Sequence, residues 1–157
     1  MLELITMVGL PGSGKTTYAL DFYPYHVYIS SDTIISHIAE SMDKSYSEVF
    51  DDTISAATYM CYAELALASF AGENIVIDRT NLTKRARAAN FSKLKYSKPY
   101  RSVAIVMDVP LELLKLRLTK RNENGKIIPD KVLDKFIDSF EMPTLDEGFD
   151  EIKVIKV

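Results

Sequence analysis

The chain has few of the residues that cross-link a protein or anchor it in a membrane. Its 157 residues contain no tryptophan, two histidines and one cysteine, Cys61. A single thiol excludes an internal disulfide, and its apolar helical surroundings favour a core residue over a nucleophile. No unbroken apolar run approaches the roughly 18 residues of a membrane span, and Met1-Leu2-Glu3 lacks the basic start of a secretory signal. We therefore expect one domain over residues 1–157, in a reducing cytoplasm and without a membrane partner.

Charge is nearly balanced over the whole chain but unevenly distributed along it. The net charge of −3 gives no general attraction to nucleic acid. Residues 32–73 carry eight acids and one base, whereas residues 79–101 carry eight bases and no acid. Lys93, Lys95 and Lys98 are interpreted as a solvated helix face, but this explains the arginines of the segment less well. A second basic group consists of Lys115, Arg117, Lys120 and Arg121.

Apolar runs rich in valine and isoleucine alternate with helical patterns. Strands are predicted at 2–8, 26–30, 74–78, 102–107 and 151–157. Helices are predicted at 15–23, 33–42, 46–71, 84–96, 110–122 and 130–141. Helix boundaries are indicated by a Ser45/Glu48 capping box, a stop at Gly72, a cap at Thr83 and a first-turn Pro110. The alternation predicts an α/β fold with a central five-stranded, mainly parallel sheet, whose ligands bind at the carboxyl ends of the strands.

The segment GLPGSGKT at 9–16 fits the phosphate-binding pattern GxxxxGK[ST] at every fixed position. It also lies where the pattern requires, between an apolar strand and a helix. Glycines let backbone N–H groups surround a phosphate, and the helix N-terminus adds its positive dipole end. We expect Lys15 to reach the β- and γ-phosphates of a nucleoside triphosphate and the Thr16 hydroxyl to bind Mg²⁺. The predicted nucleotide-binding residues here are Gly9, Pro11, Gly12, Ser13, Gly14, Lys15, Thr16 and Thr17.

Two acids lie at the ends of predicted strands. Asp32 follows the second strand, where it would either accept a proton from a substrate hydroxyl or cap the next helix; the two roles are compatible. Asp78 ends the apolar run Ile75-Val76-Ile77, the pattern of a Walker B segment, and would hold Mg²⁺ directly or through water. An ordinary strand-end turn is the alternative for Asp78.

Arg117 and Arg121 are four residues apart and share a helix face. The polar segment 122–126 then breaks the helix. An arginine-bearing helix followed by such a loop suits a lid that closes over a nucleotide, because the planar guanidinium matches phosphate oxygens. A solvated helix face is the alternative.

With these pieces in place, the chain resembles the kinase domain of polynucleotide 5′-kinases of the phage and animal types, within the wider group of P-loop kinases. The matching segments are GLPGSGKTT at 9–17, YISSDTI at 28–34, IVIDRTNLT at 75–83, the two lid arginines and FEMPTLDEGFDEI at 140–152. The last segment is the most specific, although its chemistry reveals only turns at Pro143 and Gly148. The resemblance implies a three-layer α/β/α P-loop NTPase fold of the nucleotide-kinase type with a helical lid.

The resemblance also implies an activity: transfer of the γ-phosphate of ATP, with Mg²⁺, to the 5′-hydroxyl of DNA or RNA. By position, Lys15, Asp32 and Arg121 match the catalytic residues, and Arg117 lies one turn before the lid arginine. Thr16 and Asp78 match the metal residues. Because the helices after Asp32 are acidic, a nucleic acid strand is expected along the Arg79–Arg87 side instead. The expected substrate-binding residues are Asp32, Arg79, Asn81, Arg85 and Arg87.

Two departures leave other functions open. Ile35 stands where phage-type members have an arginine that binds a substrate phosphate, and Ser30-Ser31 replaces a frequent Asn-Arg pair. Ile35 and the acidic 40–52 region favour a kinase of a small hydroxyl-bearing molecule, such as a nucleoside, nucleotide or sugar. A nucleotide-binding regulator is a third hypothesis, although it would leave Asp32 and Arg121 without a role. Oligomeric state is left open by the sequence.

Overall fold

The computed structural model describes residues 1–95, 99–122 and 125–157. Within them, five strands form one parallel sheet in the order β2-β3-β1-β4-β5. The strands are β1 (Leu2–Val8), β2 (Val27–Ile29), β3 (Ile75–Asp78), β4 (Tyr100–Asp108) and β5 (Glu151–Lys156). The predicted fold class is therefore confirmed, and the sheet is parallel throughout.

Helices connect the strands, as a parallel sheet requires. They are α1 (Lys15–Phe22), α2 (Ser31–Ser41), α3 (Tyr46–Ala71), α4 (Lys84–Lys93), α5 (Leu111–Asn122) and α6 (Asp130–Ser139), followed by the short 3₁₀ helix η1 (Leu145–Glu147). The largest difference from prediction is at α4, which ends at Lys93 with Leu94 as its C-cap, and α2 begins two residues early because Ser30 caps it. The last position of the predicted 84–96 helix and Lys98 lie outside the described residues.

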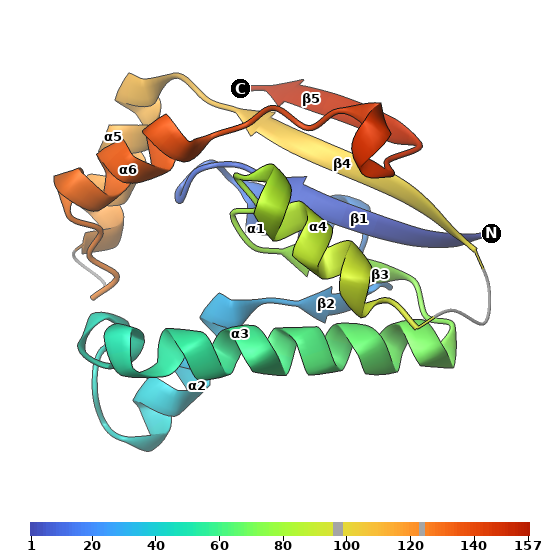
Figure 1. Ribbon diagram of the computed structural model, residues 1–157. Helices are drawn as coiled ribbons and strands as arrows, with labels where there is room; N and C mark the ends of the chain where they lie inside the picture. The colour runs from blue at the N-terminus through green and yellow to red at the C-terminus, as the bar shows by residue number, and fades with distance from the viewer. Residues whose placement is uncertain (96–98, 123–124) are drawn as a thin grey trace.

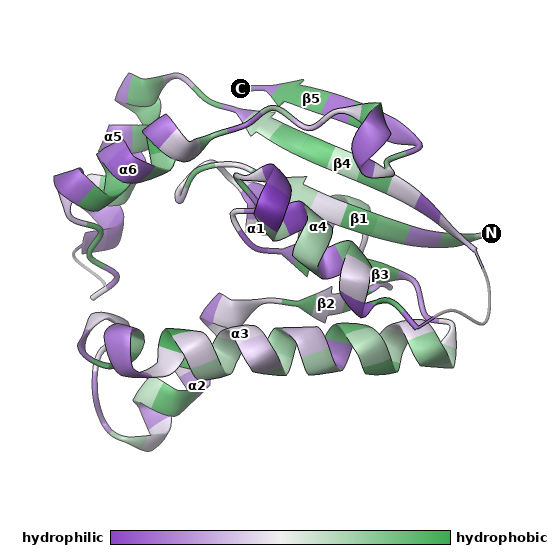
Figure 2. Ribbon diagram, viewed as in Figure 1, coloured by the Kyte–Doolittle hydropathy of each residue, from purple (hydrophilic) through white to green (hydrophobic). Residues whose placement is uncertain are grey.

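Two apolar layers cover the sheet. On one face, Leu4, Ile75 and Ile77 pack against Cys61 and Leu65 of α3. The other face is covered by α1, and α5 and α6 lie together at one end of the molecule (Figure 1). The central strands are the most hydrophobic part of the chain, whereas α4 begins with strongly hydrophilic residues (Figure 2). Cys61 is buried in this core, as predicted.

Helix α3 has well-defined ends. Ser45 and Glu48 form the predicted capping box, and Gly72 ends the helix in the left-handed conformation at φ 74°. By length and composition alone, α3 is the one helix among the described residues that is apolar enough to cross a membrane. It contacts the sheet through Cys61 and Leu65, and 28% of its apolar window is buried.

Candidate active site

The phosphate-binding loop lies between β1 and α1, at the carboxyl edge of the sheet. Gly12 and Gly14 have φ values of 80° and 92°, which non-glycine residues rarely adopt. A Cβ atom on Gly9 would lie 2.7 Å from Ser13 Oγ, so the chain passes here too closely for a side chain. Ser13 Oγ is buried without a hydrogen-bond partner among the described atoms. A cradle of glycines with a spare buried hydroxyl fits the phosphates of a nucleotide.

Lys15 folds back over this loop. Its Nζ donates hydrogen bonds to the carbonyl oxygens of Gly9 (3.0 Å) and Leu10 (2.9 Å). Burial lowers the pKa of Lys15 to about 8; Asp78 and Asp32 act in the opposite direction, and Arg121 adds to the lowering. The two predicted acids thus favour the ammonium form of Lys15, although burial dominates.

Asp78 and Thr16 meet beside the loop. Thr16 Oγ1 donates to Asp78 Oδ2 at 2.6 Å, and the Tyr28 hydroxyl donates to the same oxygen. Among the described residues, no group of three or more His, Cys, Asp or Glu side chains forms a metal site. A metal here would thus need nucleotide phosphates and water as its remaining ligands, the coordination that Mg²⁺ favours in kinases. Thr16 and Asp78 together fit that requirement.

Asp32 is the second residue of α2 and is exposed. The helix cap is Ser30, whose side chain accepts from the backbone N–H of Thr33, so Asp32 is not needed as the cap. Its Oδ1 accepts a hydrogen bond of 2.5 Å from the Tyr46 hydroxyl at the start of α3. Burial, followed by the charge of Asp32, raises the pKa of Tyr46 well above its ordinary value of 10, so the hydroxyl remains a donor at alkaline as well as neutral pH.

The predicted lid corresponds to α5 and the segment 122–126, of which positions 123–124 lie outside the described residues. Arg117 Nη1 donates to the carbonyl oxygen of Gly12 at 3.3 Å, and the Arg121 side chain is partly exposed. Leu118 packs with Leu10 of the phosphate loop and with α6. Arg117 therefore contacts the phosphate loop, and Arg121 lies one turn further along the same helix.

A second set of contacts ties the lid to the N-terminus of α3. Ser47 Oγ donates to the carbonyl oxygen of Gly125 at 2.8 Å and accepts from the backbone N–H of Ile127 at 3.0 Å. The Lys126 ammonium lies 4.9 Å from the centre of the Tyr46 ring. Helix α3, whose Tyr46 contacts Asp32, is thus joined directly to residues 125–127.

Two of the expected substrate-binding residues have a different role. Arg87 is almost completely buried and pairs with Glu147, so it is not available to a nucleic acid. Asn81 is buried and donates to the carbonyl oxygen of Met7 (2.8 Å), which fixes the loop after β3 to β1. The predictions for these two residues were wrong, because a basic run was interpreted as surface although one side of α4 faces the sheet. Arg85 is exposed and Arg79 is partly exposed.

Sequence reasoning also missed Tyr28, Tyr46 and Ser47. Tyrosine and serine occur throughout ordinary cores and helix ends, and no spacing marks these three. Burial, followed by the hydrogen bond to Asp78, raises the pKa of Tyr28 as well. The two carboxylates of the site are therefore each oriented by a tyrosine hydroxyl that stays protonated.

Comparison with known proteins identifies the family. The model of a protein family described as an AAA domain matches residues 4–143 of this chain. The chain belongs to this family. A bifunctional polynucleotide phosphatase/kinase of Schizosaccharomyces pombe is 24% identical over 164 residues, covering 98% of this chain and 33% of the relative. The first three curated relatives are covered over only 33%, 20% and 33% of their lengths.

Solved structures of similar fold include an RNA repair complex and a sugar kinase. A chain in the structure of the Pnkp1/Rnl/Hen1 RNA repair complex matches with a TM-score of 0.66 and 26% identity, over 88% of this chain and 43% of that one. A sugar kinase from Janibacter sp. matches with a TM-score of 0.66 and 20% identity, over 99% and 86%. The resemblance to polynucleotide kinases and the P-loop kinase fold are thus confirmed, and they support a kinase activity.

Proposed function

We propose that the chain transfers the γ-phosphate of ATP to the 5′-hydroxyl of DNA or RNA ends. The observation that carries the proposal is the phosphate loop, where Thr16 bonds to Asp78 and Arg117 bonds to the carbonyl oxygen of Gly12, because phosphoryl transfer needs a metal residue and a cation at the phosphates. The polynucleotide acceptor is inferred from the relatives, which include a polynucleotide phosphatase/kinase. The exposure of Asp32 agrees with this acceptor, because a large substrate must reach the general base from solvent.

In this proposal Asp32 accepts the proton of the attacking hydroxyl as its oxygen bonds to the γ-phosphorus. The bond from that phosphorus to the β–γ bridging oxygen breaks, and ADP leaves with the electron pair. Lys15 and the lid arginines, Arg117 and Arg121, stabilise the charge on the phosphoryl oxygens. Bound Mg²⁺, held by Thr16 and Asp78, would neutralise charge on the β- and γ-phosphate oxygens. Tyr46 keeps Asp32 oriented toward the acceptor.

One observation favours a small hydroxyl-bearing acceptor instead. Ile35, three residues after Asp32, is fully buried against Ala39, Val49 and Ala57, so α2 offers no cation to a substrate phosphate at that position. A polynucleotide must then be bound elsewhere, whereas a neutral metabolite needs no such cation.

The test is transfer of labelled γ-phosphate from ATP with Mg²⁺. The acceptors are 5′-hydroxyl DNA and RNA oligonucleotides beside nucleosides, nucleotides and sugars, and Asp32→Asn is the matched control. We expect label on the oligonucleotides, loss of transfer in the control and unchanged ATP binding. Label confined to a small molecule would assign the alternative function. Nucleotide binding without any labelled acceptor would favour a regulator.

A further inference from the structure

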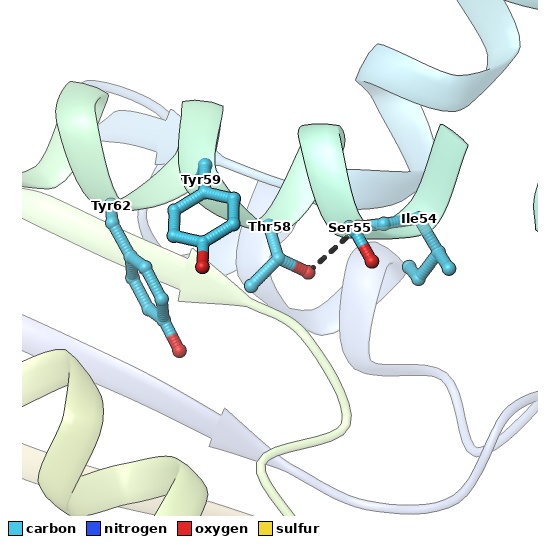
Figure 3. Close-up of a pocket in the computed structure, with 5 residues that line it drawn as sticks. All are labelled: Ile54, Ser55, Thr58, Tyr59 and Tyr62. Atoms are coloured by element: carbon cyan, nitrogen blue, oxygen red, sulfur yellow. Dashed lines mark hydrogen bonds between the residues drawn. The ribbon is translucent and has the colours of Figure 1, made fainter. Parts of the chain in front are cut away.

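A hollow of about 280 Å³ lies along the middle of α3, outside the phosphate site. Its lining side chains project from one side of the helix, toward the loop that follows β3 (Figure 3). They are Ile54, Ser55, Thr58, Tyr59 and Tyr62. This volume is slightly below the roughly 300–1,000 Å³ of pockets that hold whole drug-sized ligands. The hollow is therefore of a size to hold one planar ring of a longer ligand rather than a complete metabolite.

Two cations border this hollow. Arg79 Nη2 donates to Thr58 Oγ1 at 3.1 Å, and Arg79 Cζ lies 5.9 Å from the centre of the Tyr62 ring. Lys93 Nζ, from the end of α4, lies 5.1 Å from the same ring centre. Neither cation takes part in an ion pair among the described residues. Tyr62 therefore holds two positive charges at the rim, where they remain available to an anion.

Tyr59 supplies a flat aromatic surface beside these charges. Tyr59 is 74% exposed, although it lies on a helix whose neighbouring face is in the core. An exposed aromatic ring next to cations is the arrangement with which proteins bind single-stranded nucleic acid, because a base stacks on the ring while phosphates contact the cations. The hydroxyls of Ser55 and Thr58 add polar partners in the same hollow.

The hollow also lies within a few nucleotides' reach of Asp32. Arg79 directly follows Asp78 of the candidate active site, and Tyr46, thirteen residues before Tyr59 on α3, contacts Asp32. Thirteen helical residues span about 20 Å. A strand that advances at least ~3.4 Å per nucleotide covers that distance in no more than about six nucleotides.

From this arrangement we propose that the α3 groove, formed by Tyr59, Tyr62, Arg79 and Lys93, binds the single-stranded nucleotides that follow the 5′ end. The inference rests on the proposed function. A base stacks on Tyr59, and the phosphates follow Arg79 and Lys93 on the α4 side. They avoid the N-terminal half of α3, where Asp51 and Asp52 are exposed. The groove thereby supplies the substrate cations that Ile35 cannot provide.

The test separates binding from transfer. Equilibrium binding of a fluorescent 5′-hydroxyl single strand of about twelve nucleotides is measured by anisotropy for the wild type, Tyr59→Ala and Lys93→Gln. The control variant is Tyr25→Ala, since Tyr25 is 96% exposed and precedes β2. We expect Tyr59→Ala to weaken binding at least about fivefold and Lys93→Gln to lower the slope of log K against log salt by about one. Tyr25→Ala should leave both unchanged.

Transfer is then measured with a dinucleotide and with the longer strand. The inference predicts that Tyr59→Ala raises KM for the longer strand only and leaves kcat and the dinucleotide unchanged. If the wild type phosphorylates oligonucleotides but both groove variants bind and react as it does, the groove is overturned while the proposed function stands. If binding depends on Tyr59 and Lys93 but no label is transferred, the groove stands and the proposed function falls.

Discussion

Arg87, which is buried, and Glu147, which is partly buried, form a two-bond ion pair that joins α4 to η1, just before β5. Arg87 Nε lies 2.8 Å from Glu147 Oε1, and Nη2 lies 3.1 Å from Oε2. Arg87 Nη1 also donates to the carbonyl oxygen of Asn81, whose side chain is bonded to β1. The pair thus connects the C-terminal motif to the strand that carries the phosphate loop. This gives the motif at 140–152 a structural role.

Removing one partner of this pair should destabilise the protein strongly. Glu147→Ala leaves the guanidinium of Arg87 buried without its counter-charge, so we expect the free energy of unfolding to fall by about 3–5 kcal/mol. Urea denaturation measures the difference. The matched control is Glu151→Ala, which removes the partner of Arg101 at the half-exposed edge of the sheet and should cost about 1 kcal/mol or less. Equal losses in the two variants would contradict a special role for the buried pair.

The same pair predicts how stability depends on pH. Burial opposes the charged form of Glu147, but the hydrogen bonds from Arg87 and from the backbone of Thr144 outweigh it and lower the pKa of Glu147 below its ordinary 4.5. A carboxyl with a lowered folded-state pKa adds stability above its unfolded pKa and loses it as pH falls through the folded value. The stability gap between wild type and Glu147→Ala should therefore be constant near neutrality and shrink below about pH 4.5. Urea midpoints across this range test it; a gap that persists in acid would be inconsistent with the pair.

The parts of the fold that depend on local patterns were predictable. The phosphate loop, the Ser45/Glu48 capping box and the Gly72 stop each have a signature within a few residues, and the structure contains all three. The ion pair between Arg87 and Glu147 could not be predicted, because its partners are 60 residues apart in the sequence. Charge alone does not reveal which arginine of a basic run points into the core. Tyr46 likewise reaches Asp32 across fourteen residues through the packing of α2 on α3.

Nucleotide binding should be linked to protonation of Lys15. With a pKa of about 8, part of the Lys15 population is neutral slightly above physiological pH. Phosphate oxygens favour the ammonium, so binding of ATP takes up a proton and its affinity should fall as pH rises through about 8. Titration calorimetry in two buffers of different ionisation enthalpy measures the proton uptake. In Lys15→Met, which has no ammonium, this uptake should vanish along with most of the affinity; uptake that persists would assign the proton to another group.

The two tyrosines of the site should have separable effects. Tyr46→Phe removes the hydrogen bond that orients Asp32, so we expect kcat to fall about tenfold, the cost of one hydrogen bond to a charged group. ATP affinity and the unfolding free energy should change little. Tyr28→Phe, the matched variant at Asp78, should instead change the Mg²⁺ concentration that gives half-maximal transfer. Steady-state kinetics at varied ATP, acceptor and Mg²⁺ distinguishes the two. A Tyr46→Phe enzyme with full kcat would show that Asp32 is held well enough by α2 alone, and equal changes in both variants would indicate a general loosening of the site.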